Sequence, residues 1–420
     1  MKIAIVSSGF LPVIDGVTVS GYCRLQQLSK LGHEVILFCP DYSALAAVYP
    51  NWKDYTGQIL PGVTIVNLAS DPFMGLDFER NVARRSYSKM LQELETFQPD
   101  IIHVDEPERL FMGFWRIPGL NFAKKAGIPC VSFFRTNFLE YLEDYFLIPG
   151  IKLSTLEFII KPAIVHIYNA YDATLATSTI THKKLINLGI KNTIHKNLVG
   201  FDAAQFFNHK GNQDHSRQEN FFAHKYGLSK VDKQTKLVFL GRLTPDKGWE
   251  FTLDTFAKIT TEINLDNVAL IIAGDGSMVQ EIRARLSKIT PHFHLLGRIS
   301  PEDVPALLAN CDLHITTSEK ENRGLTILEA FAAGIPVLAP CAGGVVENIL
   351  DGENGFLFNP GDQDDFISKL KLLVENPSLR KSMGKKGQET IAQYKWEQAV
   401  ANLISIWEEQ IAKKKNSKRE

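Results

Sequence analysis

The chain has 420 residues, of which 45% are hydrophobic and 22% are charged, and its formal net charge is −1. A chain of this length exceeds what one hydrophobic core usually organises, so we expect two or three domains in a globular protein. The near-zero net charge gives no global sign of nucleic-acid binding, and we expect no nucleic-acid partner.

The cysteines and the apolar runs indicate a reducing compartment. Cys39 and Cys130 lie in apolar, strand-like runs, and no two of the five cysteines are close together in sequence. We therefore expect reduced thiols and no disulfide frame. The apolar part of residues 1–12 is too short for a signal peptide, and no run of 18 uncharged apolar residues follows. We expect a cytoplasmic protein that is either free in solution or peripheral on the inner face of a membrane.

Short apolar runs alternate with amphipathic segments through the first half of the chain. Helical patterns at 17–31 and 83–96 separate runs that indicate buried parallel strands, at 2–8, 34–40, 100–104 and 130–134. This alternation predicts a doubly wound α/β domain.

The same pattern begins again after a polar stretch at 208–222. The later strand-like runs are 236–241, 268–274, 293–297, 313–318 and 336–340. Two such units place a ligand-binding cleft between them. The expected division is a first domain over 1–200, a second over 201–390, and a helix over 391–420 with a basic tail that either closes the second domain or crosses back to the first.

The segment 319–331, EKENRGLTILEAF, carries the clearest chemical pattern. A loop turns through Gly324 into an apolar helix, and the first amides of a helix lack partners and carry partial positive charge. The amides near Gly324, Leu325 and Thr326 are therefore a candidate diphosphate site. Glu321 would accept hydrogen bonds from a sugar, and Glu329 from the hydroxyls of a ribose. The alternative is an ordinary helix with charges at both ends.

A second segment, GRLTPDKGWE at 241–250, follows a strand and opens a helix. Arg242 and Lys247 lie five positions apart across a turn, where a guanidinium fork and a mobile ammonium group can neutralise a diphosphate leaving group. Two solvated loop charges are the alternative.

Other turns after strands are weaker candidates for ligand contact. AGDGS at 273–277 lacks the third glycine of a dinucleotide fingerprint, and LGRIS at 295–299 offers backbone polar groups to a base. The candidate binding residues in these turns are Gly241, Gly274, Gly297 and Arg298.

Gly16 follows the first strand and lets the backbone approach a ligand. No G-x-G-x-x-G motif accompanies it, which argues against a nicotinamide-binding domain.

The histidines give no sign of a metal site. His103 ends a strand, and we expect it to be a buried core residue with its hydrogen bonds satisfied. His292 and His294 have no metal-ligand spacing with neighbouring residues, and we expect no metal site.

Taken in order, these segments resemble the retaining glycosyltransferases of family four, which have the GT-B architecture of two Rossmann-like domains facing a cleft. The segments that carry the resemblance over nearly the whole chain are FLPVIDGV, LGHEVILF, PDIIHV, LVGFDAAQF, GRLTPDKG, AGDGS, LGRIS, ENRGLTILEA and GGVVENILDGENGFL.

The resemblance implies a nucleoside-diphosphate sugar, UDP or GDP most often, as the donor and no cofactor. It assigns Arg242 and Lys247 to the diphosphate, Glu329 to the ribose and Glu321 to the transferred sugar, and it brings Gly16 to the donor from the first domain. It also implies metal-independent transfer with retention of anomeric configuration.

One position departs from the family pattern. Relatives that act on lipids carry a histidine after the fourth strand-like run, where this chain has Arg135 in FFRTNF. Arginine cannot act as a base at neutral pH, but it can hold a phosphate or an anionic sugar.

The nearest members by resemblance form glycolipids, among them sulfoquinovosyl and diacylglycerol glycosyltransferases. The acceptor is then a membrane lipid or a saccharide. The apolar stretch 138–160 and the basic residues Arg80, Arg84, Arg85 and Lys89 suggest contact with an anionic membrane. A core helix and a solvated helix face are the alternative interpretation.

Other functions that stay open are a non-catalytic nucleotide-sugar-binding protein and a sugar-nucleotide epimerase. A phosphorylase is disfavoured, since no lysine has a recognisable pyridoxal-phosphate motif.

Overall fold

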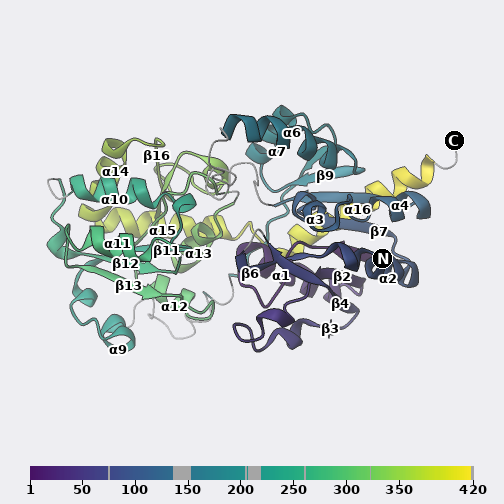
Figure 1. The fold of residues 1–420 in the computed structure, drawn as a ribbon. Helices are drawn as coiled ribbons and strands as arrows, with labels where there is room; N and C mark the ends of the chain where they lie inside the picture. Colours follow the sequence, from purple (N-terminus) through teal and green to yellow (C-terminus); the bar gives the residue numbers. More distant parts are fainter. Residues whose placement is uncertain are drawn as a thin grey trace. The chain divides into compact units, whose positions relative to one another are not determined.

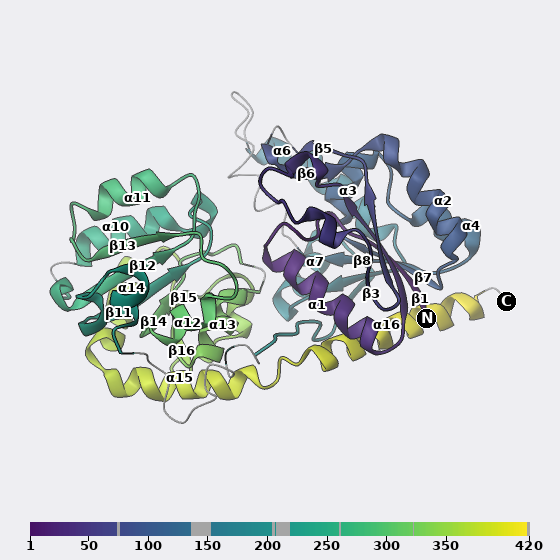
Figure 2. The same ribbon diagram turned by 90° about the horizontal axis from the view of Figure 1, so that it is seen from below.

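The computed structural model describes residues 1–73, 76–135, 153–203, 206, 219–259, 262–321 and 323–417. The described residues form two compact units (Figures 1 and 2). The first contains the described residues up to Gly200 together with those from Lys395 onward, and the second runs from Phe201 to Tyr394. The C-terminal segment therefore joins the first unit at Lys395 and not at 391.

The first unit is built on an eight-stranded sheet in the order β10-β9-β8-β7-β1-β2-β4-β3. Its neighbours pair in parallel except for the edge pair β3–β4, and β5 and β6 form a separate antiparallel pair. The strands are β1 (Lys2–Val6), β2 (Glu34–Pro40), β3 (Gly57–Leu60), β4 (Val63–Leu68), β5 (Ser70–Phe73), β6 (Leu76–Val82), β7 (Ile101–Asp105), β8 (Cys130–Phe134), β9 (Ala173–Ala176) and β10 (Thr193–His195).

Helices lie on both faces of this sheet, as a doubly wound fold requires. They are α1 (Gly16–Lys30), α2 (Tyr87–Phe97), α3 (Pro107–Phe114), α4 (Leu120–Ala126), α6 (Leu153–Asn169), α7 (Thr179–Leu188) and α16 (Trp396–Asn416). Every second residue of β1 and β2 packs in one core with apolar residues of α1 and α16. The residues between them face the other side of the sheet and pack with α2, α3 and α4. Trp407 of α16 is fully buried in the first of these cores.

The second unit contains a six-stranded parallel sheet in the order β13-β12-β11-β14-β15-β16. The strands are β11 (Thr235–Leu240), β12 (Val268–Ala273), β13 (Phe293–Gly297), β14 (Leu313–Ile315), β15 (Val337–Pro340) and β16 (Gly355–Phe358). The helices are α9 (Phe221–Tyr226), α10 (Trp249–Ile259), α11 (Val279–Leu286), α12 (Val304–Ala309), α13 (Leu325–Ala333), α14 (Gln363–Glu375) and α15 (Pro377–Ile391). Near-continuous apolar runs such as VALIIA in β12 are buried because helices cover both faces of a parallel sheet.

The predicted doubly wound α/β architecture is confirmed for both units. Cys39 and Cys130 are buried and all five cysteines are free thiols. None of the described helices combines the length and apolar character that crossing a bilayer requires. Most of the apolar stretch 138–160 and of the polar stretch 208–222 lies outside the described residues.

Candidate functional site

Three turns at the carboxyl ends of β11, β12 and β13 are joined by main-chain hydrogen bonds. The N–H of Gly241 donates to Ala273 O at 3.0 Å, and the N–H of Gly274 donates to Gly297 O at 2.8 Å. Gly274 has φ +153°, and a Cβ there would lie 1.8 Å from Gly241 O. Glycine is therefore required for close packing of these turns. The two amides already have acceptors, so the predicted contribution of Gly241 and Gly274 to ligand binding does not come from their N–H groups. Arg298, after the third turn, is exposed.

The loop after β11 gathers two cations around one buried carboxylate. Asp246 is 4% exposed, and its Oδ2 accepts from Arg242 Nη2 at 3.1 Å and lies 3.7 Å from Lys247 Nζ. Asp246 was not among the predicted site residues, although it lies between them in sequence. It holds both cations at one place.

The end of β14 fixes this loop. Ser318 Oγ donates to Asp246 O at 3.1 Å, and Thr317 Oγ1 lies 3.1 Å from Lys247 O and 3.0 Å from Gly248 O. A Cβ on Gly248 would lie 2.2 Å from Thr317 O, so the two segments touch backbone to backbone. The position of Lys247 thus depends on residues about 70 positions later in the chain.

Lys247 and Glu321 form an ion pair across this junction. Lys247 Nζ lies 2.5 Å from Glu321 Oε1, and the two side chains are only 19% and 25% exposed. The loop that carries Glu321 is held by Gly344, whose N–H donates to Glu321 O at 2.7 Å. The structure therefore brings together two residues that the sequence predicted separately.

Helix α13 begins directly after this loop with its N-terminus uncapped by any described side chain. Gly324 is the N-cap in a left-handed conformation, with φ +61°, and makes no side-chain capping bond. The amides of Leu325 and Thr326, in the first turn, have no acceptor within the helix. The assignment of these amides to a diphosphate stays a prediction.

His314 fixes the side chain of Thr326. His314 Nδ1 lies 3.1 Å from Val238 O and must donate, because a carbonyl oxygen only accepts. Nε2 then accepts from Thr326 Oγ1 at 3.2 Å. Burial lowers the pKa of His314 to about 4, so the ring is neutral at physiological pH. Sequence reasoning missed His314; a histidine inside an apolar strand was its only signal.

Glu329 lies on the second turn of α13 and is half-buried. Within the described ranges its carboxyl group has no hydrogen-bond or ion-pair partner, and burial raises its pKa to about 7. A buried carboxylate without a partner is costly. Hydrogen bonds from ligand hydroxyl groups would offset that cost.

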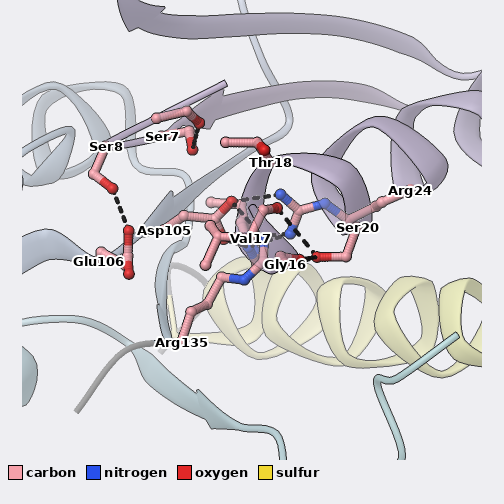
Figure 3. Close-up of polar contacts among 12 residues, drawn as sticks. Ser7, Ser8, Gly16, Val17, Thr18, Ser20, Arg24, Asp105, Glu106 and Arg135 are labelled. Carbon is pink, nitrogen blue, oxygen red and sulfur yellow. Dashed lines mark hydrogen bonds and ion pairs between the residues drawn. The ribbon is translucent and has the colours of Figure 1, made fainter. Parts of the chain in front are cut away.

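Figure 3 shows the polar cluster of the first unit, in which Arg135 extends toward α1 and β7. Arg135 Nη1 lies 3.5 Å from Asp105 Oδ2, and its other terminal nitrogen donates to Ser20 Oγ. Arg24 Nη2 also lies 2.5 Å from Asp105 Oδ2, and the side chains of Arg24, Asp105 and Arg135 are nearly buried. The two guanidinium groups hold the pKa of Asp105 well below its usual value despite its burial.

His103 contributes no charge to this cluster. Trp407 Nε1 donates to His103 Nδ1 at 3.2 Å, so the proton of the ring lies on Nε2 and is donated to Asp105 Oδ1 at 3.0 Å. Burial lowers the pKa of His103, which keeps the ring neutral. The prediction of a satisfied core histidine is confirmed.

Gly16 begins α1 and is exposed, but the helix end beside it is already capped. The Asp15 carboxylate accepts from the N–H groups of Val17 and Thr18 at 2.8 Å each.

Two buried glutamates of the first unit accept hydrogen bonds from hydroxyl groups. The Ser8 hydroxyl donates to Glu106, as Figure 3 shows, and the Tyr168 hydroxyl donates to Glu108. Burial and the neighbouring Glu106 raise the pKa of Glu108 to about 8. Neither glutamate was predicted.

Two doubly wound units, one of which carries an uncapped helix end beside clustered cations and carboxylates, define a glycosyltransferase of the GT-B class. The family model described as Glycosyltransferase Family 4 matches residues 14–197, and the model described as Glycosyl transferases group 1 matches residues 221–390. The chain belongs to glycosyltransferase family four and is a retaining transferase. The predicted family is confirmed, and the non-catalytic and epimerase alternatives are not supported.

Curated relatives align over most of the chain. The Arabidopsis thaliana sulfoquinovosyl transferase SQD2 is 28% identical over 75% of this chain, and the match spans 58% of that relative's length. A GDP-mannose-dependent α-mannosyltransferase of Mycolicibacterium smegmatis is 27% identical over 97% of both chains. The α-monoglucosyldiacylglycerol synthase of Streptococcus pneumoniae is 25% identical over 90% of this chain and 80% of its own.

A solved structure has the same fold. Anabaena HepE in complex with UDP-glucose superposes with a TM-score of 0.69 over 96% of this chain and 99% of its own, at 19% identity. At this identity the likeness supports the fold alone.

Proposed function

We propose that the second unit binds a nucleoside-diphosphate hexose and that the protein transfers the hexose to a membrane lipid with retention of configuration. The observation that carries the donor site is the Lys247–Glu321 ion pair directly before the uncapped N-terminus of α13. It places a cation, a carboxylate and unpartnered amides within a few residues of one another.

Each group has a role that follows from its surroundings. The Leu325 and Thr326 amides and the cations Arg242 and Lys247 take the diphosphate, whose charge grows as the glycosidic bond breaks. Glu321 accepts hydrogen bonds from the sugar. Because Glu321 is already paired with Lys247, the donor inserts between two groups held in place before it binds.

Glu329 is the proposed partner of the ribose. Its carboxyl group can accept from both ribose hydroxyls once it is ionised. The base is uracil or guanine in this proposal, because one relative is named as GDP-mannose-dependent and HepE was solved with UDP-glucose.

Arg135 is proposed to select an anionic group on the donor sugar or on the acceptor. Arg135 lies in a nearly buried cluster with Arg24 and Asp105, and the carboxylates of Glu106 and Asp15 also act on it. A guanidinium group held in this way can donate paired hydrogen bonds to an anionic group of a ligand. SQD2 is named for transfer of a sulfoquinovosyl group, which carries a sulfonate.

The lipid acceptor is proposed from the relative named as an α-monoglucosyldiacylglycerol synthase and from the basic residues of the first unit. Three of the four predicted basic residues have partners within the first unit. Arg80 Nη2 donates to Ser70 O at 2.6 Å, Lys89 Nζ donates to Asn67 O at 3.1 Å, and Arg85 Nη2 lies 2.8 Å from Asp71 Oδ1. Arg84, Arg85 and Lys89 are exposed, and peripheral contact with a membrane then depends on these three residues.

The test is a transfer assay with defined substrates. UDP-glucose and GDP-mannose are each incubated with the protein alone, with vesicles that contain diacylglycerol, or with a soluble saccharide, and nucleotide release and the anomeric proton signal of the product are followed. We expect release that depends on the vesicles and an α-linked product from an α-linked donor. Release with a soluble saccharide and none with lipid would overturn the lipid acceptor, and a β-linked product would overturn retention.

A further inference from the structure

A basic cavity on the first unit is separate from every residue discussed as a donor or sugar contact. Its volume is about 730 Å³, and its lining includes Asp71, Arg84, Arg85, Tyr87, Leu91 and Arg116. The lining comes from β5, from the turn before α2, from α2 itself and from the segment after α3. It is widely open to solvent, so a phosphate-bearing headgroup can reach it from outside the protein.

Two of its three guanidinium groups are uncompensated. Arg85 is satisfied by Asp71, with Nη1···Oδ2 and Nη2···Oδ1 distances of 2.9 and 2.8 Å. Arg84 and Arg116 have no ion-pair partner in the part of the chain that the structure describes, and both are exposed. Because Asp71 neutralises Arg85, the lining keeps about two net positive charges, those of Arg84 and Arg116.

Arg116 is held by an aromatic ring and not by an anion. Its guanidinium carbon lies 5.4 Å from the ring centroid of Tyr87, which is 7% exposed and packs edge-on against Phe114. The contact with the ring does not use the N–H groups of the guanidinium. These groups can still donate hydrogen bonds to an oxyanion.

A large aromatic residue directly precedes Arg116 in the chain. Trp115 ends α3 in a left-handed conformation, with φ +57°, and is 72% exposed. Non-glycine residues rarely adopt this conformation. Met112, one turn earlier on α3, is also exposed. An exposed tryptophan next to unpaired arginines is the arrangement that favours the interfacial layer of a bilayer, because the ring is amphipathic and the cations attract anionic headgroups.

We propose that this cavity binds the phosphate of an anionic phospholipid headgroup, with Arg84 and Arg116 as its ligands and Trp115 inserted in the interfacial layer. The proposal rests on the lipid acceptor above but requires only membrane binding and no sugar transfer, so the two can fail separately.

The test is co-sedimentation with vesicles of pure phosphatidylcholine and with vesicles that contain 30% phosphatidylglycerol, in about 0.1 M salt. Each basic group near an anionic surface contributes roughly 1 kcal/mol, which is about a fivefold change in affinity. Arg84→Ala and Arg116→Ala should each lower affinity for the anionic vesicles about fivefold, and Trp115→Ala should lower affinity for both kinds of vesicle. Arg283→Ala is the matched control, because Arg283 is an exposed residue of α11 without a partner in the described ranges.

Calorimetry with inorganic phosphate separates the two sources of the anion. Weak or undetectable binding of free phosphate together with strong vesicle binding is expected. An equal loss in Arg283→Ala would mean that only net charge matters, and unchanged vesicle binding in Arg84→Ala with Arg116→Ala would also overturn the proposal. Phosphate binding that the two variants abolish without any change in vesicle binding would assign the cavity to a soluble phosphate compound instead.

Discussion

Glu329→Gln tests the ribose contact through its pH dependence. Burial raises the pKa of Glu329 to about 7, and the ribose hydroxyls should bind the ionised form. At pH 6 only about one site in eleven is then ionised, and at pH 8 about ten in eleven, so nucleotide affinity should rise roughly tenfold between these pH values. Glutamine cannot ionise, so Glu329→Gln should lack this rise.

Calorimetric titration of the wild type and of Glu329→Gln with the same free nucleotide provides the measurement. The nucleotide's own phosphate titrates in the same range, but it affects both proteins equally and cancels in the comparison. Identical pH profiles for the two proteins would refute the assignment of Glu329 to the ribose.

The same pKa shift predicts the sign of a stability effect. Because the folded state holds the Glu329 proton more tightly than the unfolded state, its contribution to stability is full below the usual carboxyl pKa and is lost as the pH rises through about 7. The free energy of unfolding of the wild type should fall by at most about 3 kcal/mol over this interval relative to Glu329→Gln. Glu108, whose pKa is raised to about 8, contributes in the same direction to both proteins and does not affect the difference.

The remaining predictions concern the charged groups and one glycine. Lys247→Ala should lower the turnover rate on the order of 10²-fold, and unchanged kcat and KM for the donor would contradict its role at the diphosphate. Glu321→Ala should leave the affinity for free nucleotide within about twofold while it lowers turnover; an equal loss of affinity would place Glu321 at the nucleotide. Arg135→His should raise activity with neutral hexose donors relative to anionic ones, whereas an Arg135→Ala variant with wild-type kinetics would make Arg135 structural. Gly274→Ala should destabilise the protein by at least about 2 kcal/mol in denaturant unfolding, because its Cβ would lie 1.8 Å from Gly241 O, whereas Gly21→Ala on α1 has open space and should change stability by less than about 1 kcal/mol.

The central strands β1, β2, β7, β8 and β11 to β15 and the order of the site segments could be predicted because their signals are local, whereas β3 to β6, β9, β10 and β16 were not predicted. Continuous apolar runs such as EVILFCP and VALIIA have the length and composition of buried parallel strands, and they lie within one or two residues of the predicted bounds. The ENRGLTILEA segment likewise contains its own turn, helix start and two carboxylates.

Contacts between distant segments were not predictable in the same way. Asp246 appeared to be one of many loop carboxylates, and only the fold shows that it is buried beneath Arg242 and Lys247. His314 becomes informative only when β11 and α13 lie on either side of it. The clustering of Arg24 with Arg135 depends on their shared contact with Asp105, which lies 81 positions from Arg24, and no periodicity encodes such a contact.

The position of α16 has a consequence for the order in which the chain acquires its structure. Residues from Lys395 onward complete the core of the first unit, where Val400, Leu403 and Trp407 pack with Leu25 and other residues of the first 40 positions. During synthesis from the N-terminus, α16 is made after the whole of the second unit. The sheet of the first unit therefore lacks this helix until the second unit has left the ribosome. The domain made first should be the last to reach its native packing, and a released chain that ends at Tyr394 should be sensitive to proteases in the first unit while the second unit is protected.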